Sequence, residues 1–354
     1  MKLWDLTLPH EVLTLTHSSG FIYGVAFSPD GKWLATAGQD QTTIIWEIPS
    51  GKKIKVLQGH TDTVNTTTFS PDGVLLAIGN ADGTVMVWDT HTWQVLHTLS
   101  GFGDDRSTVP YILGVYSIKF SPLCHTESTS SSTCPLAGVG MDGHLIVWDV
   151  LTGQPMITYQ DPQAGLMSVA FSPDGTLLVV GNASVGGGDS WATILDATTG
   201  NVVHALPSAN AWTWGVAFSP DGDQLATINF YGDGKVWDVE SGEPLVSLNG
   251  IQDGGFSITY NPSGTLLAAG SNGYVSLIDA KSGLLLFPLL GHQSLVARTA
   301  FSPDGTYLAT AGFDGTARVY VVPAEDLLSL AKSRLTRSLT LEECQKYLHQ
   351  ATCP

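Results

Sequence analysis

Short apolar runs separated by turn sequences follow one another along almost the entire chain, and residues 59–89 show the pattern most clearly. The β-branched run at 64–69 predicts a strand that is covered on both faces. A Ser-Pro-Asp-Gly turn at 70–73 follows, in which proline presets φ and glycine accepts a positive φ. Residues 74–79 predict a second strand, and an Asp-Gly hairpin leads into a third strand at 84–88. The segment that follows supplies a fourth strand.

The same unit recurs along the chain. In repeats one, two, five and seven, the aromatic residue before the first turn lies 19 residues before the end of the third strand. Four antiparallel strands of this size cannot bury their own faces, so the repeats must stack on one another. The residues that open the first turns are Phe27, Phe69, Phe120, Phe171, Phe218, Tyr260 and Phe301. The third strands end in Trp-Asp at Trp88, Trp148 and Trp237, and in weaker copies at Trp46, Leu195, Ile278 and Tyr320.

These motifs resemble those of WD-repeat β-propellers and cover almost the whole chain. The resemblance implies an all-β fold, a seven-bladed WD-repeat β-propeller of four-stranded antiparallel blades over residues 1–322. Residues 11–17 predict a strand that lacks a blade of its own, and we expect it to close the ring as the outer strand of the last blade. Residues 2–6 are then surplus, which indicates either a chain that begins inside a longer protein or a short N-terminal flap.

Residues 323–354 predict a short C-terminal helical extension. Its first segment carries acidic residues early and basic residues late, and residues 340–343 form a capping box. This tail resembles the extension found after propellers in bacterial multidomain signalling proteins, including STAND-type NTPases and serine/threonine kinases. The resemblance implies an upstream NTPase or kinase domain in a longer parent chain. Alternatively, the helices only dock on the propeller.

Charge and composition narrow the function classes. The formal net charge of −17 argues against a nucleic-acid partner, which would need clustered lysine and arginine. No apolar run approaches the length of a membrane span, and the N-terminus lacks the features of a signal peptide, which favours a cytoplasmic location.

The cysteines form two local pairs, Cys124 with Cys134 and Cys344 with Cys353, without the spacing of a zinc site. Without a secretion signal, we expect these four to be free thiols.

The resemblance to WD repeats also implies a buried hydrogen-bonded set in each repeat, made of a histidine, a hydroxyl, a turn aspartate and the tryptophan. No repeat matches the whole set, since Ile78 replaces the hydroxyl in repeat two, Tyr320 replaces the tryptophan in repeat seven, and His17 lies one residue out of register. A buried set of this kind satisfies its own hydrogen bonds, so we expect a structural role and no catalysis. The expected structural residues are His60, Asp82, Trp88, His292, Thr310, Asp314, Trp46, Trp148 and Trp237.

The candidate binding position lies four residues before each repeat's first-turn aromatic residue. It marks the start of the innermost strand, and in WD-repeat proteins it lines the face that grips peptides and protein segments. Asn65 and Ala297 occupy it in two repeats, and large apolar or aromatic residues occupy it in the other five. Alternatively, these large side chains pack between blades or plug the channel. The predicted partner-binding residues are Tyr23, Tyr116, Met167, Trp214 and Phe256 at this position, with Trp212, Phe230, Tyr231, Phe313 and Arg298 beside it.

These observations favour a non-catalytic scaffold or sensor module that binds a protein or peptide on the channel face, within a signalling protein. The alternative is a propeller that binds a small molecule or a glycan, because aromatic rims also stack on sugars. The ten histidines lack metal-ligand spacing, and the sequence contains no Gly-rich phosphate loop, nucleophile elbow or paired-acid constellation. We therefore predict no enzymatic activity, no cofactor and no metal site.

Overall fold

The computed structural model describes residues 10–102, 114–126, 133–161, 164–184, 190–207, 212–251 and 254–322. Within these ranges the chain forms strands and turns and contains no helix. The predicted helical extension at 323–354 and the surplus residues 2–6 lie outside the described residues. No helix in the described part of the chain is long and apolar enough to cross a membrane.

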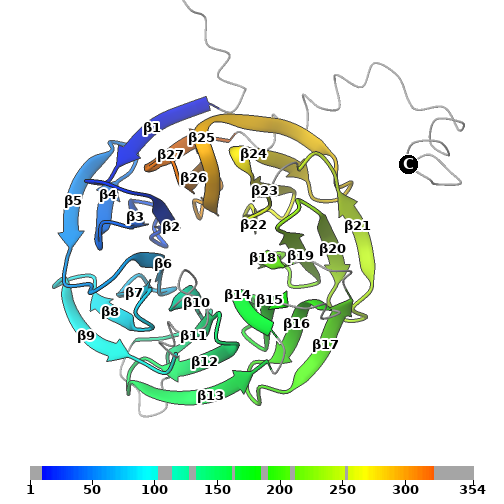
Figure 1. The fold of residues 1–354 in the computed structure, drawn as a ribbon, viewed down its shortest axis with the longest axis horizontal. Coiled ribbons are helices and arrows are strands. Elements are labelled where there is room, and N and C mark those ends of the chain that lie inside the picture. The colour runs from blue at the N-terminus through cyan, green and yellow to red at the C-terminus, as the bar shows by residue number, and fades with distance from the viewer. Residues whose placement is uncertain are drawn as a thin grey trace, which may run out of the picture.

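The strands form four-stranded antiparallel blades arranged in a ring, each running outward from an inner strand at the centre (Figure 1). This confirms the predicted fold class. Blades one to three consist of β2 Ile22–Phe27, β3 Trp33–Gly38, β4 Thr43–Glu47, β5 Lys52–Leu57; β6 Val64–Phe69, β7 Leu75–Asn80, β8 Val85–Asp89, β9 Gln94–Leu99; and β10 Val115–Phe120, β11 Pro135–Gly140, β12 His144–Asp149, β13 Gln154–Gln160. Blades four and five consist of β14 Ala164–Phe171, β15 Leu177–Ser184, β16 Ser190–Asp196, β17 Val202–Pro207; and β18 Thr213–Phe218, β19 Gln224–Asn229, β20 Gly234–Asp238, β21 Pro244–Leu248.

Blades six and seven share one long strand, β25 Leu285–Phe301. Its first part pairs with β24 Asn272–Asp279 as the outer strand of blade six, beside β22 Ser257–Tyr260 and β23 Leu266–Gly270. Its second part pairs with β26 Tyr307–Gly312 as the inner strand of blade seven. The five separate sheets and this shared pair together make seven blades.

Blade seven takes its outer strand from the other end of the described chain. β1, His10–Thr16, pairs antiparallel with β27, Thr316–Val321, over the register His10↔Val321 to Thr16↔Thr316 (Figure 1). Leu15 of β1 is buried in a cluster that includes Ile44 and Trp46 of blade one. β1 therefore completes the last blade and also packs against the first.

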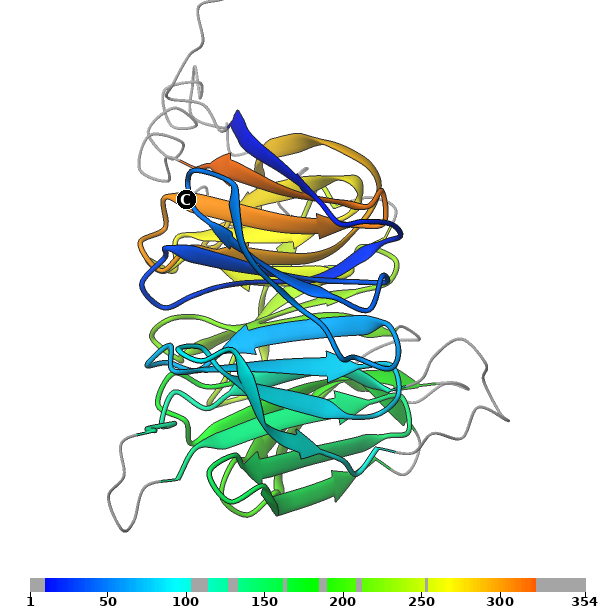
Figure 2. The same cartoon turned by 90° about the vertical axis from the view of Figure 1, so that its left-hand side faces the viewer.

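The side chain of the residue after the aromatic holds the first turn together, a serine in six repeats and Asn261 in repeat six. In blade two, Ser70 Oγ donates to Asp72 Oδ1 at 2.6 Å and accepts from the backbone N–H of Leu75 at 2.9 Å. Gly73 adopts φ of 75°, which the turn requires and which a side chain would strain. Figure 2 shows the ring from its side, with the strands running between two faces. The first turns lie at one face and the turns between second and third strands at the other, because consecutive strands are antiparallel.

The core lies between neighbouring blades. Phe69 and Trp88 of blade two, for example, share a buried cluster with Ile45 and Leu57 of blade one. A single blade therefore depends on its neighbours to cover its faces, as the repeat pattern predicts.

The expectation of free thiols is wrong for one pair. Cys124 and Cys134 form a disulfide, and both are fully buried in the core between blades two and three. The two residues lie at the base of the expanded turn between β10 and β11, where the sheet brings them together. Cys344 and Cys353 lie outside the described residues.

Candidate functional site

One end of the central channel gathers most of the aromatic residues that the sequence singled out. Consecutive strands of a blade run in opposite directions, so the start of the inner strand and the turn between the second and third strands lie at the same end. Tyr23 and Trp214 lie in inner strands near their starts, whereas Phe230, Tyr231 and Phe313 come from turns between second and third strands.

Rings from blades one and seven form the first part of this surface. Phe21 stacks on Phe313 with ring centroids 5.1 Å apart, and Tyr23 meets the edge of Phe313 at 5.2 Å. Phe313 then reaches Phe256 of blade six at 6.3 Å. Aromatic pairs at such separations stabilise one another beyond the area that they bury, so these side chains hold each other in place.

Rings from blades five and six continue the surface. Trp214 packs edge-to-face on Phe256 at 4.9 Å and lies 6.4 Å from Trp212. Phe230 contacts Phe256 at 5.7 Å and Tyr231 at 5.6 Å, in both cases edge to face. We refer to the whole set as the aromatic arc, which consists of Phe21, Tyr23, Trp212, Trp214, Phe230, Tyr231, Phe256 and Phe313.

The members of the aromatic arc differ in exposure. Tyr231 is 68% exposed, Phe230 43% and Phe21 40%, whereas Phe256 is only 4% exposed and lies beneath its neighbours. The indole N–H of Trp214 is buried and makes no hydrogen bond within the part of the chain that the structure describes. Phe256 therefore supports the surface from below, and the exposed part of the surface consists of rings such as Phe230 and Tyr231.

Three predicted residues are not among the packed rings of the aromatic arc. Met167 is 1% exposed and belongs to the interior, so its side chain is not available on this face. Tyr116 is half-buried, and burial raises the pKa of its hydroxyl to about 12. The Arg298 side chain lines the channel itself and donates to the carbonyl oxygen of Tyr116 at 2.9 Å.

The sequence interpretation missed Phe21. This residue precedes β2 and lies outside the position used to choose candidates. Its two-residue separation from Tyr23 could have identified it, because side chains two apart in an extended segment lie on the same side. Trp212 and Trp214 show the same spacing in blade five.

The His-Asp pairs of blades one and seven are buried, with ring nitrogen and carboxylate 3.0 Å apart. In blade one, His17 Nδ1 lies 3.0 Å from Asp40 Oδ1, and His17 Nε2 lies 2.8 Å from Thr36 Oγ1. The Trp46 indole N–H donates to Thr36 Oγ1 at 2.8 Å. The expectation that no repeat has a complete set is therefore wrong. His17 lies one residue out of register in the sequence, yet its ring reaches Asp40 and Thr36.

The other two histidine sets are partial. In blade seven, His292 lies 3.0 Å from Asp314 and 2.7 Å from Thr310, while the hydroxyl of Tyr320 donates to the carbonyl of Leu290 at 3.4 Å. In blade two, where Ile78 replaces the hydroxyl, both ring nitrogens of His60 and the Trp88 indole N–H are buried and find no hydrogen-bond partner among the described residues. The hydrogen bonds of the blade-one and blade-seven histidines are made within their own blades, as buried polar groups require.

Stability should fall as the pH drops below about 6.5. Burial, the largest cause, lowers the pKa of His17, and the hydrogen bond to Asp40 only partly opposes it. Burial likewise lowers the pKa of His60 and His292 from 6.5. The unfolded chain therefore binds protons below pH 6.5 that the folded chain excludes, so folding stability is complete above this pH and is lost below it. Urea unfolding from pH 8 to pH 5 measures this slope.

The matched control is His17→Gln, which removes one of the three titrating groups. Its stability should depend less steeply on pH than that of the parent chain. A parent profile that is flat between pH 8 and pH 5 would contradict the assignment of neutral buried histidines.

Comparison with known proteins identifies the repeats. The family model described as WD domain, G-beta repeat matches residues 10–47, 51–89, 153–190 and 283–320. These four segments therefore match the WD40 repeat, and each begins in or near the outer strand of one blade and ends within the third strand of the next or close to its start. The similar proteins include WD-repeat proteins, as the resemblance in the sequence predicted.

Three relatives illustrate the similarity. Guanine nucleotide-binding protein subunit beta-5b of Danio rerio is 32% identical over 213 residues, which is 58% of this chain and 53% of that protein. WD repeat-containing protein SL1-17 of Schistosoma mansoni is 25% identical over 211 residues, 59% of this chain and 51% of that protein. Nuclear distribution protein nudF of Aspergillus niger is 34% identical over 64 residues, 18% of this chain and 14% of that protein. The matched regions thus span from 14% to 53% of the lengths of these relatives.

Proposed function

We propose that this protein is a non-catalytic scaffold or sensor module that binds a protein or peptide partner on the aromatic arc. WD40 repeats support a general role in protein interaction. The observation that carries the proposal is the continuous set of mutually packed rings at one end of the channel, with Phe21, Phe230 and Tyr231 open to solvent. Exposed aromatic side chains are typical anchors because they bury a large area at a small cost in conformational entropy.

The packing of the aromatic arc also supports this use. Trp214 and Phe256 hold their neighbours by edge-to-face contacts, so the exposed rings lose little freedom when a partner covers them. Turn residues and inner-strand residues contribute together, which gives the surface an extended shape across blades five, six, seven and one.

We place this module in a signalling protein, with an NTPase or kinase domain upstream in a bacterial parent chain, on the basis of the tail sequence. The relatives above are eukaryotic, and one is named as a subunit of a guanine nucleotide-binding protein. A cytoplasmic location rests on the sequence alone. The Cys124–Cys134 disulfide weighs against it, because such bonds are typical of oxidising compartments.

Replacing Trp214 should weaken partner binding strongly. Peptides selected on the parent chain from a random library provide the ligands, and fluorescence anisotropy measures their dissociation constants. We expect Trp214→Ala to cost about 2 kcal/mol or more, or roughly 30-fold in affinity, as for a central aromatic anchor. Tyr231→Ala, at the most exposed ring, tests the same surface without disturbing the packing around Phe256.

Trp93→Ala is the matched control. Trp93 is half-buried against Trp33, with ring centroids 5.5 Å apart, in the turn between β8 and β9 at the opposite end of the ring. The Trp93→Ala variant should bind the selected peptides with the affinity of the parent chain. Selected peptides that bind equally well to Trp214→Ala, Tyr231→Ala and the parent chain would place the working surface elsewhere.

A further inference from the structure

Two rings of small side chains line the central channel, and a single cation interrupts each of them. In every inner strand, the residues one and three positions before the first-turn aromatic point to the same side, because side chains alternate along a strand. The nearer position holds Ala26, Thr68, Lys119, Ala170, Ala217, Thr259 and Ala300. The farther position holds Gly24, Thr66, Ser117, Ser168, Gly215, Ser257 and Arg298. All fourteen line one cavity of about 540 Å³.

Arg298 crosses this channel. Its guanidinium donates to the carbonyl oxygens of Tyr116 at 2.9 Å, Ala297 at 3.0 Å and Phe256 at 3.5 Å. Tyr116 belongs to blade three and Arg298 to blade seven, which are not neighbours in the ring, so the side chain forms a bar just below the aromatic arc. These contacts use three of the five N–H donors of a guanidinium.

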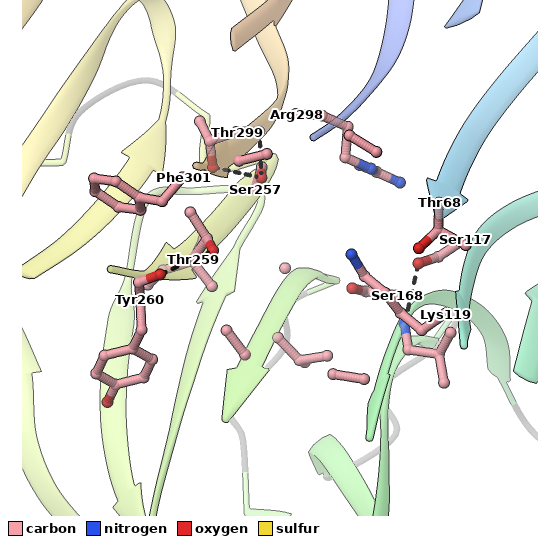
Figure 3. Close-up of a pocket in the computed structure, with 18 of the residues that line it drawn as sticks. Thr68, Ser117, Lys119, Ser168, Ser257, Thr259, Tyr260, Arg298, Thr299 and Phe301 are labelled. Atoms are coloured by element: carbon pink, nitrogen blue, oxygen red, sulfur yellow. Dashed lines mark hydrogen bonds between the residues drawn. The ribbon is translucent and has the colours of Figure 1, made fainter. Parts of the chain in front are cut away.

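Lys119 enters the same channel from the end of β10 (Figure 3). Among the described residues, its ammonium makes no hydrogen bond and no ion pair. The hydroxyl groups of Thr68, Ser117 and Ser168 lie on the same side of the channel, as Figure 3 shows. A lysine with three donors and neighbouring hydroxyls is thus available in the channel, where its side chain is open to solvent.

The channel carries positive charge without a counter-ion. The residues that line it include no aspartate or glutamate within the described chain. Desolvation by the channel wall, the largest cause, lowers the pKa of Lys119, and the charge of Arg298 lowers it further. Burial likewise lowers the pKa of Arg298 to about 10. Two cations that destabilise each other in one cavity are stabilised together by a bound anion.

We propose that the channel binds a free oxyanion of the phosphate or polyphosphate class between Lys119 and Arg298. Two cations match an anion that carries at least two charges, and guanidinium and ammonium groups with hydroxyl donors are typical phosphate ligands. The Arg298 side chain crosses the channel just below the aromatic arc. The anion therefore enters from the opposite end of the channel, past the first turns. Pro71, Pro122, Pro173, Pro262 and Pro303 of those turns line that part of the cavity. This site is separate from the partner surface proposed above.

Calorimetric titration of the full chain with inorganic phosphate, and separately with pyrophosphate, tests the proposal at low ionic strength. We expect saturable binding that Lys119→Gln weakens by about tenfold to a hundredfold, the usual range for one charge-assisted contact. Lys119→Arg, which keeps the charge, should restore most of the affinity. Sodium chloride at matched ionic strength should produce no saturable signal.

The matched control is Lys55→Gln, which removes an exposed lysine from the outer strand β5 and should leave anion binding unchanged. The unfolding midpoint of each variant confirms that the ring remains folded. Absence of saturable binding by the parent chain would overturn the proposal, as would equal affinities of Lys119→Gln and Lys55→Gln. Binding that falls with Tyr231→Ala but not with Lys119→Gln would place the anion on the aromatic arc and would also overturn it.

Discussion

A chain that begins at Thr16 should lose more than about 4 kcal/mol of stability and should associate with itself. This change removes β1, and with it the packing of Leu13 and Leu15 against blade one. Leu15 is buried and Leu13 is half-buried, and full burial of a leucine contributes about 1.5–3 kcal/mol. The backbone hydrogen bonds between β1 and β27 are also lost. The ion pair between Glu11 and Arg318 is lost as well. β27 then becomes an open edge, which is a template for pairing with another chain. Urea unfolding measures the first effect and light scattering the second.

The matched control begins at His10 and keeps all of β1. It should unfold at the same urea concentration as the full chain if the effect belongs to β1 itself. Because the longer deletion retains His17, the hydrogen bonds of His17 to Asp40 and Thr36 are not removed in either variant. Equal stability of the two shortened chains would mean that the ring does not depend on this strand for closure.

The fold was predictable because each repeat contains the turn sequences that mark the ends of its strands. The Ser-Pro-Asp-Gly motif gives the end of one strand and the start of the next, as the bonds of Ser70 show. The unpaired strand near the N-terminus and the missing outer strand of the last repeat together predicted the pairing of β1 with β27 that the structure contains. These features depend on local turn chemistry and on counting strands, which a single sequence provides.

The site was only partly predictable because exposure depends on neighbouring blades. Phe256 and Trp214 occupy the same repeat position, yet Phe256 lies under rings that come from adjacent turns. Met167 at this position is only 1% exposed, whereas Trp214 is half-buried. A repeat position thus predicts the end of the channel at which a side chain lies, and its neighbours decide whether it is exposed.

Lys119 was missed, and Arg298 was predicted only as a residue beside the partner-binding position, for a different reason. Lys119 and Arg298 belong to repeats three and seven and occupy different positions within them. Nothing in either repeat predicts that they share one cavity, because only closure of the ring brings blades three and seven to face each other.

The Cys124–Cys134 disulfide was missed because the absence of a secretion signal outweighed the short spacing. The geometry of the hairpin base decides that pairing.

Thr36→Val should destabilise the protein by about 2–4 kcal/mol although it hardly changes the volume of the side chain. Thr36 Oγ1 accepts from the Trp46 indole N–H, and its own hydroxyl donates to His17 Nε2. Valine leaves both partners buried without a hydrogen bond, and each such group costs about 1–3 kcal/mol. Urea unfolding at pH 8 measures the loss while the histidines remain neutral.

Ile78→Val, at the equivalent position of blade two, is the matched control because the Trp88 indole N–H and the His60 nitrogens already lack partners there. It should cost only about 0.5–1.5 kcal/mol, the value for one buried methylene group. Ile78→Thr should cost no more than Ile78→Val, since a hydroxyl at this position can bond to Trp88 and His60 as Thr36 bonds in blade one. Equal losses for Thr36→Val and Ile78→Val would show that the hydrogen bonds of Thr36 contribute no net stability, so that packing alone holds the blade.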